Sequence, residues 1–157
     1  MDIVSYRNEL LGNNSNIFNS DYSISMLANN VAVVSANKND AVLNFGDEIS
    51  MMILLLKGKF SVYMNWADGD LVKVYEINPG ELCSVNYVNG LKKSPSDYRV
   101  IADEDVQFAL VPIDFVEQTV NEYQELRSHF FNDIQSKQRT IMHSINDYTK
   151  QLLSEKN

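Results

Sequence analysis

The sequence is poor in cysteine and in long apolar runs, and each scarcity excludes a class of protein. Among 157 residues the single cysteine, Cys83, cannot form an internal disulfide, which is typical of proteins from a reducing cytoplasm. No stretch approaches the roughly 20 apolar residues that cross a bilayer. The N-terminus shows no basic segment followed by an apolar one, so no signal peptide is indicated. We therefore expect a cytoplasmic protein with no membrane partner.

Positive charge is also scarce. Lysine and arginine number 13 against 21 acidic residues, which leaves a net charge of −8. Surfaces that bind nucleic acid need clustered basic side chains to neutralise phosphates. We expect no DNA binding by this chain itself, although a segment beyond Asn157 could still bind DNA.

The centre of the chain has the pattern of a β-sandwich or barrel. The stretch 44–63 contains a Gly46-Asp47 turn, an apolar run over 51–56, a break at Gly58 and an alternating strand over 59–63. A glycine reaches positive φ without strain, so each of these glycines can mark a corner of a rolled antiparallel sheet. Turn signals separate about eight short strands, expected at 31–35, 41–45, 51–56, 59–63, 71–77, 82–85, 98–102 and 106–111, with a loop at 86–97.

Helical patterns flank this central region. Two short helices are expected at 2–11 and 18–27, the second capped by Ser20 or Asp21. After Pro112 the period changes, and Asp114 can cap a further short helix. From 122 to 153 there is no proline or glycine, which predicts one long helix of about 48 Å at 1.5 Å per residue.

The long helix carries an apolar stripe in steps of three, four or seven residues. A helix of this length would extend beyond a small roll and expose the stripe unless a second copy covered it. We therefore expect a parallel homodimer through this helix. The alternatives are a helix folded back onto its own roll, or one broken around 136–138. The residues predicted for the dimer helix are Leu126, Phe130, Ile134, Ile141, Ile145, Tyr148 and Leu152.

The stretch Phe45-Gly46-Asp47, followed by the residues 51–63 that end in Gly-Lys-Phe-Ser-Val-Tyr, resembles the signature of the cyclic-nucleotide-binding β-roll. The nearest relatives would be the Crp–Fnr superfamily of bacterial transcription regulators. The resemblance implies a mainly β fold, a double-stranded β-helix or jelly roll. It implies N-terminal helices over 1–30, a sensory roll over 31–112, and a short helix plus dimerisation helix over 113–157. In that family a winged helix-turn-helix follows the long helix, and it is absent from this chain.

The resemblance also places a phosphate cassette, which in the family holds the nucleotide through a glutamate on the ribose and an arginine on the phosphate. The first half of the cassette falls on Gly80, Glu81, Cys83, Ser84 and Val85, with the family's Gly-Glu at Ser84-Val85. The second half falls on 96–102. There the arginine position holds Ser96, the next position Asp97, and the small alanine is Tyr98.

Both anchors of a cyclic nucleotide are therefore missing, and Asp97 would repel a phosphate. A shifted alignment could use Arg99 as the anchor, but neighbours on a strand face opposite sides, which argues against it. Lys92 and Lys93 could supply charge from the loop, although paired loop lysines are usually solvated. We predict a roll that has lost cyclic-nucleotide binding, needs no cofactor, and responds to a different small molecule, a partner protein, or nothing.

Other chemistry has little support in the sequence. Cys83 could be a redox or haem sensor, but a buried apolar role is the more common one for a free cysteine. A cupin metalloenzyme needs two or three histidines inside its barrel, whereas the only two, His129 and His143, lie on the long helix. We expect no metal and no enzyme. The favoured interpretation is the effector domain of a longer regulator. Two alternatives stay open: a stand-alone dimeric interaction module without DNA binding, and a small-molecule enzyme built on a roll, which bound metal in the purified protein would support.

Overall fold

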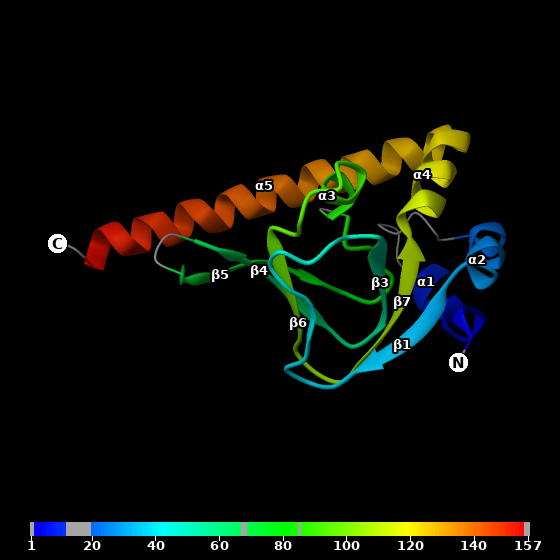
Figure 1. Cartoon of the computed structure of the whole chain (residues 1–157), viewed down its shortest axis with the longest axis horizontal. Coiled ribbons are helices and arrows are strands. Elements are labelled where there is room, and N and C mark those ends of the chain that lie inside the picture. The colour runs from blue at the N-terminus through cyan, green and yellow to red at the C-terminus, as the bar shows by residue number, and fades with distance from the viewer. Residues whose placement is uncertain (1, 12–19, 67–68, 85, 156–157) are drawn as a thin grey trace.

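The computed structural model describes residues 2–11, 20–66, 69–84 and 86–155. A small helical layer begins the chain (Figure 1), formed by a 3-10 helix η1 (Ile3–Tyr6), α1 (Arg7–Leu11) and α2 (Asp21–Ala28). The cap of α2 is Ser20, whose hydroxyl accepts the backbone N–H of Ser23 at 3.1 Å. The helix at 2–11 and the capped helix before Ala28 are confirmed, while residues 18 and 19 of the second prediction lie outside the described residues.

Among the described residues, seven strands form two antiparallel sheets, as expected for a jelly roll. One sheet has the order β1-β7-β3, and the other has the order β2-β6-β4-β5. The predicted strand at 82–85 is wrong, because within its described residues, 82–84, only Leu82 pairs, in a single bridge with Leu54. The strands are β1 (Ala32–Ala36), β2 (Ala41–Leu43), β3 (Met51–Lys57), β4 (Phe60–Asn65), β5 (Leu71–Ile77), β6 (Tyr98–Ala102) and β7 (Val106–Pro112).

Strand β3 is buried on both faces, which explains why its sequence is an unbroken apolar run. Leu54 and Leu56 point toward the helices, whereas Ile53 and Leu55 point into the interior of the roll. All four side chains are at most 5% exposed. β3 is therefore the wall shared by two apolar clusters, one between sheet and helices and one inside the roll.

The corner between β3 and β4 depends on a glycine, as the sequence predicts. Gly58 has φ of +100°, and a Cβ at this position would lie 2.7 Å from Cγ1 of Val106 and 2.8 Å from the carbonyl oxygen of Asp105. Any other residue would meet both backbone strain and a collision. This corner carries the chain from the three-stranded sheet to the four-stranded sheet.

Two local predictions fail where tertiary packing takes over. The expected loop at 86–97 begins with a helix, α3 (Asn86–Leu91). Tyr87 on α3 packs edge-on against Phe130, with ring centroids 4.8 Å apart, so a long-range contact holds a turn that lacks helix signals. Helix α4 (Ile113–Glu122) begins after Pro112 without a side-chain cap, and Asp114 lies inside its first turn rather than at the cap.

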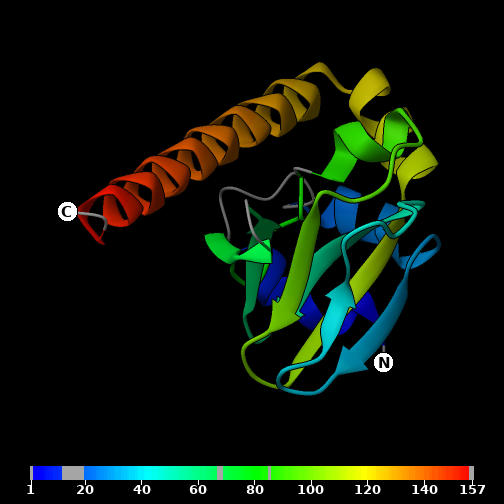
Figure 2. The same cartoon turned by 60° about the vertical axis from the view of Figure 1, so that its left-hand side comes forward.

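The long helix is present as α5 (Gln124–Glu155), with 32 residues. It is separated from α4 only by Tyr123, which has an extended backbone with φ −119° and ψ 105°. The predicted alternative of a break around 136–138 is wrong. Figures 1 and 2 show α5 running across one side of the roll, with its C-terminal end extending beyond β4 and β5.

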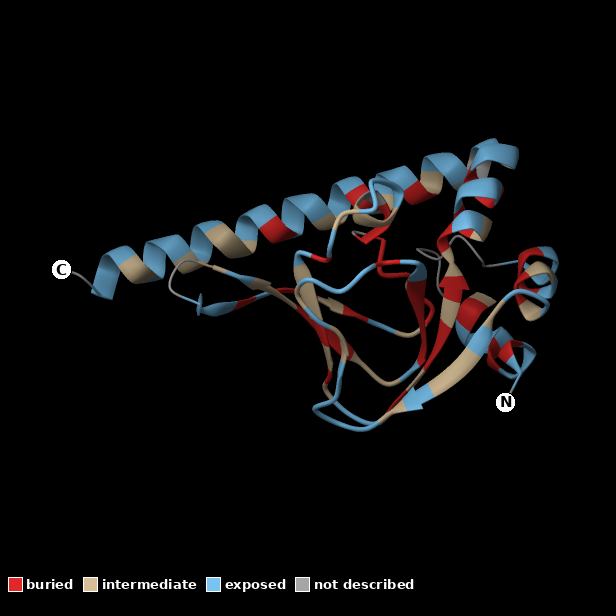
Figure 3. Cartoon of the chain, viewed as in Figure 1, coloured by how far each residue is buried: buried red, intermediate tan, exposed pale blue. Residues whose placement is uncertain are grey.

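One face of α5 packs on its own roll, which corrects part of the predicted dimer stripe (Figure 3). Phe130, Ile134 and Ile141 are 1%, 6% and 5% exposed within a single chain. The hydroxyl of Ser144 donates to the carbonyl oxygen of Val74 on β5 at 3.0 Å. These three apolar side chains are already covered, so the alternative of a helix folded back onto its own roll describes this part of α5.

The rest of the predicted stripe is less buried. Ile145 and Tyr148 are partly exposed and pack at the edge of the interior cluster. The Tyr148 hydroxyl bonds to the carboxylate of Asp70 in the turn before β5. Leu152, nearer the end of α5, is also partly exposed. Leu126 belongs to α5, but its side chain lies outside the described part of the structure.

Candidate functional site

The first half of the predicted cassette runs along the edge of β3. The backbone N–H of Cys83 donates to the carbonyl of Ile53 at 2.8 Å, and the N–H of Leu55 donates to the carbonyl of Glu81 at 3.0 Å. Gly80 belongs to the turn before this segment, with φ of +89° and its N–H bonded to the carbonyl of Leu55. These bonds hold the cassette backbone against β3.

Two side chains of the cassette are bonded directly to α5. One oxygen of Glu81 accepts from the Lys137 ammonium at 2.9 Å, and its other oxygen accepts the N–H of Asn78 at 3.0 Å. The hydroxyl of Ser84 donates to the Asp133 carboxylate at 2.7 Å. We call these two contacts, Glu81–Lys137 and Ser84–Asp133, the clasp. The clasp joins the cassette to the helix at positions one helical turn apart.

The Lys137 side chain places an ammonium group beside the cassette, in contact with Glu81. Its nitrogen is 5.4 Å from the centroid of the Tyr75 ring, a distance at which a cation–π attraction operates. The side chains of Lys137 and Glu81 are only 19% and 13% exposed. This positive charge is therefore already neutralised by a carboxylate of the same chain.

Cys83 lies inside the roll, fully buried, between two polar neighbours. Its sulfur is 3.6 Å from the Tyr75 hydroxyl and 3.4 Å from the Asn86 side-chain nitrogen. Burial raises the pKa of the Cys83 thiol to about 11, although the Tyr75 hydrogen bond acts in the opposite direction. A thiol of this kind stays protonated at neutral pH and is a poor nucleophile or metal ligand.

In the second half of the cassette, Ser96 has a structural role. It is 4% exposed, and its hydroxyl donates to the carbonyl of Tyr98 at 2.9 Å and accepts the N–H of Tyr98 at 3.1 Å. Its backbone also pairs with Gly46 and Asp47. Asp97 is exposed beside it. The position that would need a guanidinium thus holds a neutral hydroxyl whose bonds form a turn.

The strand alternation places Tyr98 and Arg99 on opposite faces of β6. Tyr98 packs against the interior cluster, and its pKa is raised by burial and by the nearby Asp97 and Cys83. The Arg99 guanidinium instead stacks on the ring of Phe45, 4.7 Å from its centroid. Arg99 therefore does not point into the roll, as the alternation argument predicts.

The residues predicted for the cassette contact Lys137 and Asp133 on α5, two partners that the sequence pattern did not predict. A signal was available, because the apolar stripe steps by seven from Ile134 to Ile141 and Lys137 occupies the skipped position. A charged residue on the stripe that packs against the roll needs a partner there. Of the predicted cassette residues, Val85 lies outside the described residues. The described part contains no group of three or more His, Cys, Asp or Glu side chains that could hold a metal ion.

The two sheets, the cassette along β3 and the crossing helix together define the fold of a cyclic-nucleotide-binding domain. A cyclic nucleotide-binding domain from Methylobacillus flagellatus superposes with a TM-score of 0.66 at 15% identity, over 98% of this chain and 86% of that one. A transcriptional regulator from Thermotoga maritima gives 0.64 at 18% identity, over 81% of this chain and 98% of that one.

Oxidized CprK in complex with o-chlorophenolacetic acid gives a TM-score of 0.57 at 17% identity, over 76% of this chain and 48% of that chain. At these identities the likeness establishes the fold. No protein-family model and no curated protein matches the sequence. No helix in the described ranges is long and apolar enough to span a membrane.

Proposed function

We propose that this chain is the sensory domain of a Crp–Fnr-type transcription regulator that works without a cyclic nucleotide. The observation that carries the proposal is the Glu81–Lys137 ion pair, which ties the segment that resembles a phosphate cassette to α5. The regulator and binding-domain neighbours support the kind of domain. The single buried thiol, Cys83, fits a cytoplasmic location.

The electrostatics of the cassette oppose a phosphate. Binding a cyclic phosphate in a partly desolvated site requires a charge-assisted bond from a cation. Ser84 and Ser96 are neutral, the Lys137 ammonium is paired with Glu81, and the carboxylates of Asp97 and Asp133 lie at the edges of the site. A nucleotide would have to displace an internal ion pair and approach two further negative charges.

The clasp supplies a direct route from cassette to helix. Because Glu81 and Ser84 both contact α5, a change in the cassette must either move the helix or break these bonds. The input would be a non-nucleotide small molecule or a partner protein. The neighbour CprK, solved in complex with o-chlorophenolacetic acid, is a case of this fold with a ligand that is not a nucleotide.

Calorimetric titration with cyclic AMP and cyclic GMP tests the loss of nucleotide binding. We expect no heat of binding for either nucleotide up to about 1 mM, a concentration at which ligands held by only about 4 kcal/mol become visible. A matched titration into Lys137→Met asks whether the ammonium contributes any anion affinity. Micromolar binding by the unmodified chain would contradict the proposal.

The output would be a homodimer through a face of α5 that shares only Ile145 and Leu152 with the predicted stripe and lies next to it around the helix. Phe131 and Met142 are 47% and 57% exposed, and Ile145 and Leu152 are partly exposed. With polar residues at the intervening positions they complete a regular 4-3 heptad pattern, the spacing of a two-helix seam. This seam consists of Phe131, Gln135, Gln138, Met142, Ile145, Thr149 and Leu152.

Sedimentation of the chain over a range of concentrations tests the dimer. We expect reversible dimerisation that Met142→Glu weakens at least tenfold, because the new carboxylates would face each other at a two-fold axis. Thr140→Glu is the matched control, since Thr140 is exposed on the helix away from the seam. Equal effects of the two variants, or a monomer at all concentrations, would rule out this seam.

A stand-alone dimeric module without DNA binding is the second candidate, favoured by the net charge of −8. The two candidates differ in the reading frame that follows codon 157. A helix-turn-helix segment there supports the regulator, and a stop codon supports the module. Both candidates share the predicted division of the chain into helices over 1–30, a roll over 31–112 and an output helix region over 113–157.

A further inference from the structure

A hollow of about 340 Å³ lies where α2 meets the junction of α4 and α5, away from the cassette. Tyr22 and Met26 come from α2, Glu122 ends α4, and Tyr123 and Gln124 form the junction. A volume of this size is at the lower end of the range for small-molecule sites. The hollow therefore has room for a compact organic molecule.

Tyr22 and Tyr123, which both line this hollow, contact each other. Their hydroxyl oxygens are 2.8 Å apart, and their rings meet edge to face with centroids 6.1 Å apart. Tyr22 is nevertheless 62% exposed, unusually open for an aromatic side chain with two specific contacts. A ring that is held in place yet open to solvent presents a ready surface to a ligand.

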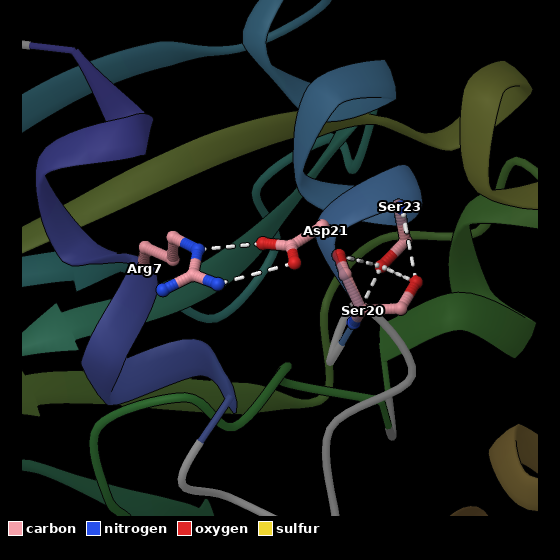
Figure 4. Close-up of polar contacts among 4 residues, drawn as sticks. All are labelled: Arg7, Ser20, Asp21 and Ser23. Atoms are coloured by element: carbon pink, nitrogen blue, oxygen red, sulfur yellow. Dashed lines mark hydrogen bonds and ion pairs between the residues drawn. The ribbon is translucent and has the colours of Figure 1, made fainter.

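The start of α2 is held by hydrogen bonds at its cap and by an ion pair with α1, as Figure 4 shows. Ser20 and Ser23 form a reciprocal capping box, with each side chain bonded to the backbone of the other. Asp21 accepts two bonds from the Arg7 guanidinium, at 2.5 and 3.1 Å. The Arg7 charge is thus paired on the α1 side, and the wall formed by α2 does not depend on the ligand.

The lining selects for positive charge. Glu122 is exposed, and one of its oxygens accepts from the Gln118 amide at 3.2 Å, while the other has no hydrogen bond to a described residue. Among the described residues that line the hollow, none is a lysine, arginine or histidine. Tyrosine rings and a methionine thioether attract a cation with an apolar body. A phosphate or carboxylate would meet the Glu122 carboxylate and, among the described lining residues, no cationic side chain.

We propose that this hollow, the junction site, binds a small organic amine with an aromatic or aliphatic body. The ammonium pairs with Glu122, and the body packs on Tyr22 and Met26. Because Tyr123 is the only residue between α4 and α5, a ligand there contacts both helices at the point where their angle is set. That regulatory consequence rests on the proposed function, whereas the binding itself does not.

Binding of 2-phenylethylamine at pH 7, followed by calorimetry and by NMR shifts of Tyr22 and Tyr123, tests the site. The uncharged 2-phenylethanol and the anionic 3-phenylpropionate serve as comparison ligands. We expect the amine to bind with a millimolar or lower Kd, roughly tenfold tighter than the alcohol, and the anion not to bind.

Two variants and a matched control locate the binding. Glu122→Gln should remove the roughly tenfold preference for the amine and leave the alcohol unchanged, and Tyr22→Ala should weaken both. Glu117→Gln, an exposed carboxylate elsewhere on α4, should change neither. No binding of the amine at 10 mM, equal binding of amine and anion, or equal losses in Glu122→Gln and Glu117→Gln would overturn the proposal. None of these outcomes depends on dimerisation or on cyclic nucleotides.

Discussion

Glu81 and Lys137 form the least exposed ion pair in the described part of the chain. Their side chains are 13% and 19% exposed, whereas the members of the other pairs are 37% or more. Partly buried charges lose hydration, and removing one partner leaves the other uncompensated. The pair therefore matters more to stability than the exposed pairs, whose contribution is close to zero.

A double-mutant cycle on this pair measures the clasp. We expect Glu81→Gln and Lys137→Met each to lower the free energy of unfolding by about 1–3 kcal/mol, because each leaves a partly buried charge unpaired. The double variant should cost less than the sum, in urea unfolding followed by circular dichroism. Lys150→Met, an exposed lysine on the same helix, is the control. Additive losses would mean that the two groups are not coupled.

Cys83 predicts an alkaline dependence of stability. Its thiol has a pKa of about 11 when folded and about 8.5 in an unfolded chain. The folded state keeps this proton when the unfolded state has lost it, so stability should fall as the pH rises from about 8.5 to about 11. Burial also raises the pKa of Tyr75, which acts in the same direction.

Urea unfolding at several pH values checks this dependence. Cys83→Ser replaces the thiol by a hydroxyl that does not titrate in this range, so the variant should lose stability less steeply with pH. Because the pKa of Tyr75 is also raised by burial, part of the loss of stability with rising pH should remain in this variant. If the variant and the unmodified chain had identical slopes, the buried thiol would not be the group that titrates.

Helix α5 has two working faces, about 100° apart around its axis. One face packs on the roll through Phe130, Ile134 and Ile141, and the adjacent face exposes Phe131 and Met142. Residues next to each other in the sequence therefore lie on different faces, one packed on the roll and one exposed. A single heptad stripe in the sequence cannot distinguish them, because both faces follow the same period.

Ile141 and Met142 provide a matched test of the two faces. Ile141→Ala should lower the free energy of unfolding by about 2–4 kcal/mol, because it leaves a cavity where the Ile141 side chain packs in the interior cluster. Met142→Ala should change it by less than about 0.5 kcal/mol at protein concentrations too low for dimerisation. Both effects can be measured by urea unfolding, and equal losses would mean that α5 does not pack on the roll in this orientation.

The complete chain combines an acidic surface with a helix that extends past the roll. The net charge is −8, and Figure 2 shows the C-terminal end of α5 well clear of the sheets. A net negative charge opposes the approach of the phosphate backbone. A regulator built on this domain would need a separate basic segment to reach DNA.

Fluorescence anisotropy with a labelled DNA duplex tests this expectation. We expect no binding tighter than about 0.1 mM at about 0.1 M salt, the level of weak non-specific association. A lysine-rich peptide of similar length serves as the positive control. Salt-sensitive micromolar binding by this chain alone would show that its few basic residues gather into a functional surface.

The alternation of apolar and polar residues, the turn glycines and the proline-free C-terminal segment were sufficient to predict seven of the eight expected strands, the Gly58 corner and the long helix. Those features depend on local sterics and on the burial period, which are written in neighbouring residues. The absence of a cation at Ser96 could be read in the same way, once the resemblance had placed the cassette.

The pairing of distant residues required the folded chain. Lys137 meets Glu81, Tyr87 holds α3 against Phe130, and Tyr22 meets Tyr123, in each case across more than 40 positions of sequence. Nothing in the local pattern says which of two equivalent stripes on α5 will face the roll. That choice follows from side-chain packing and from where the clasp can neutralise its charges, and these are properties of the assembled sheets and helix.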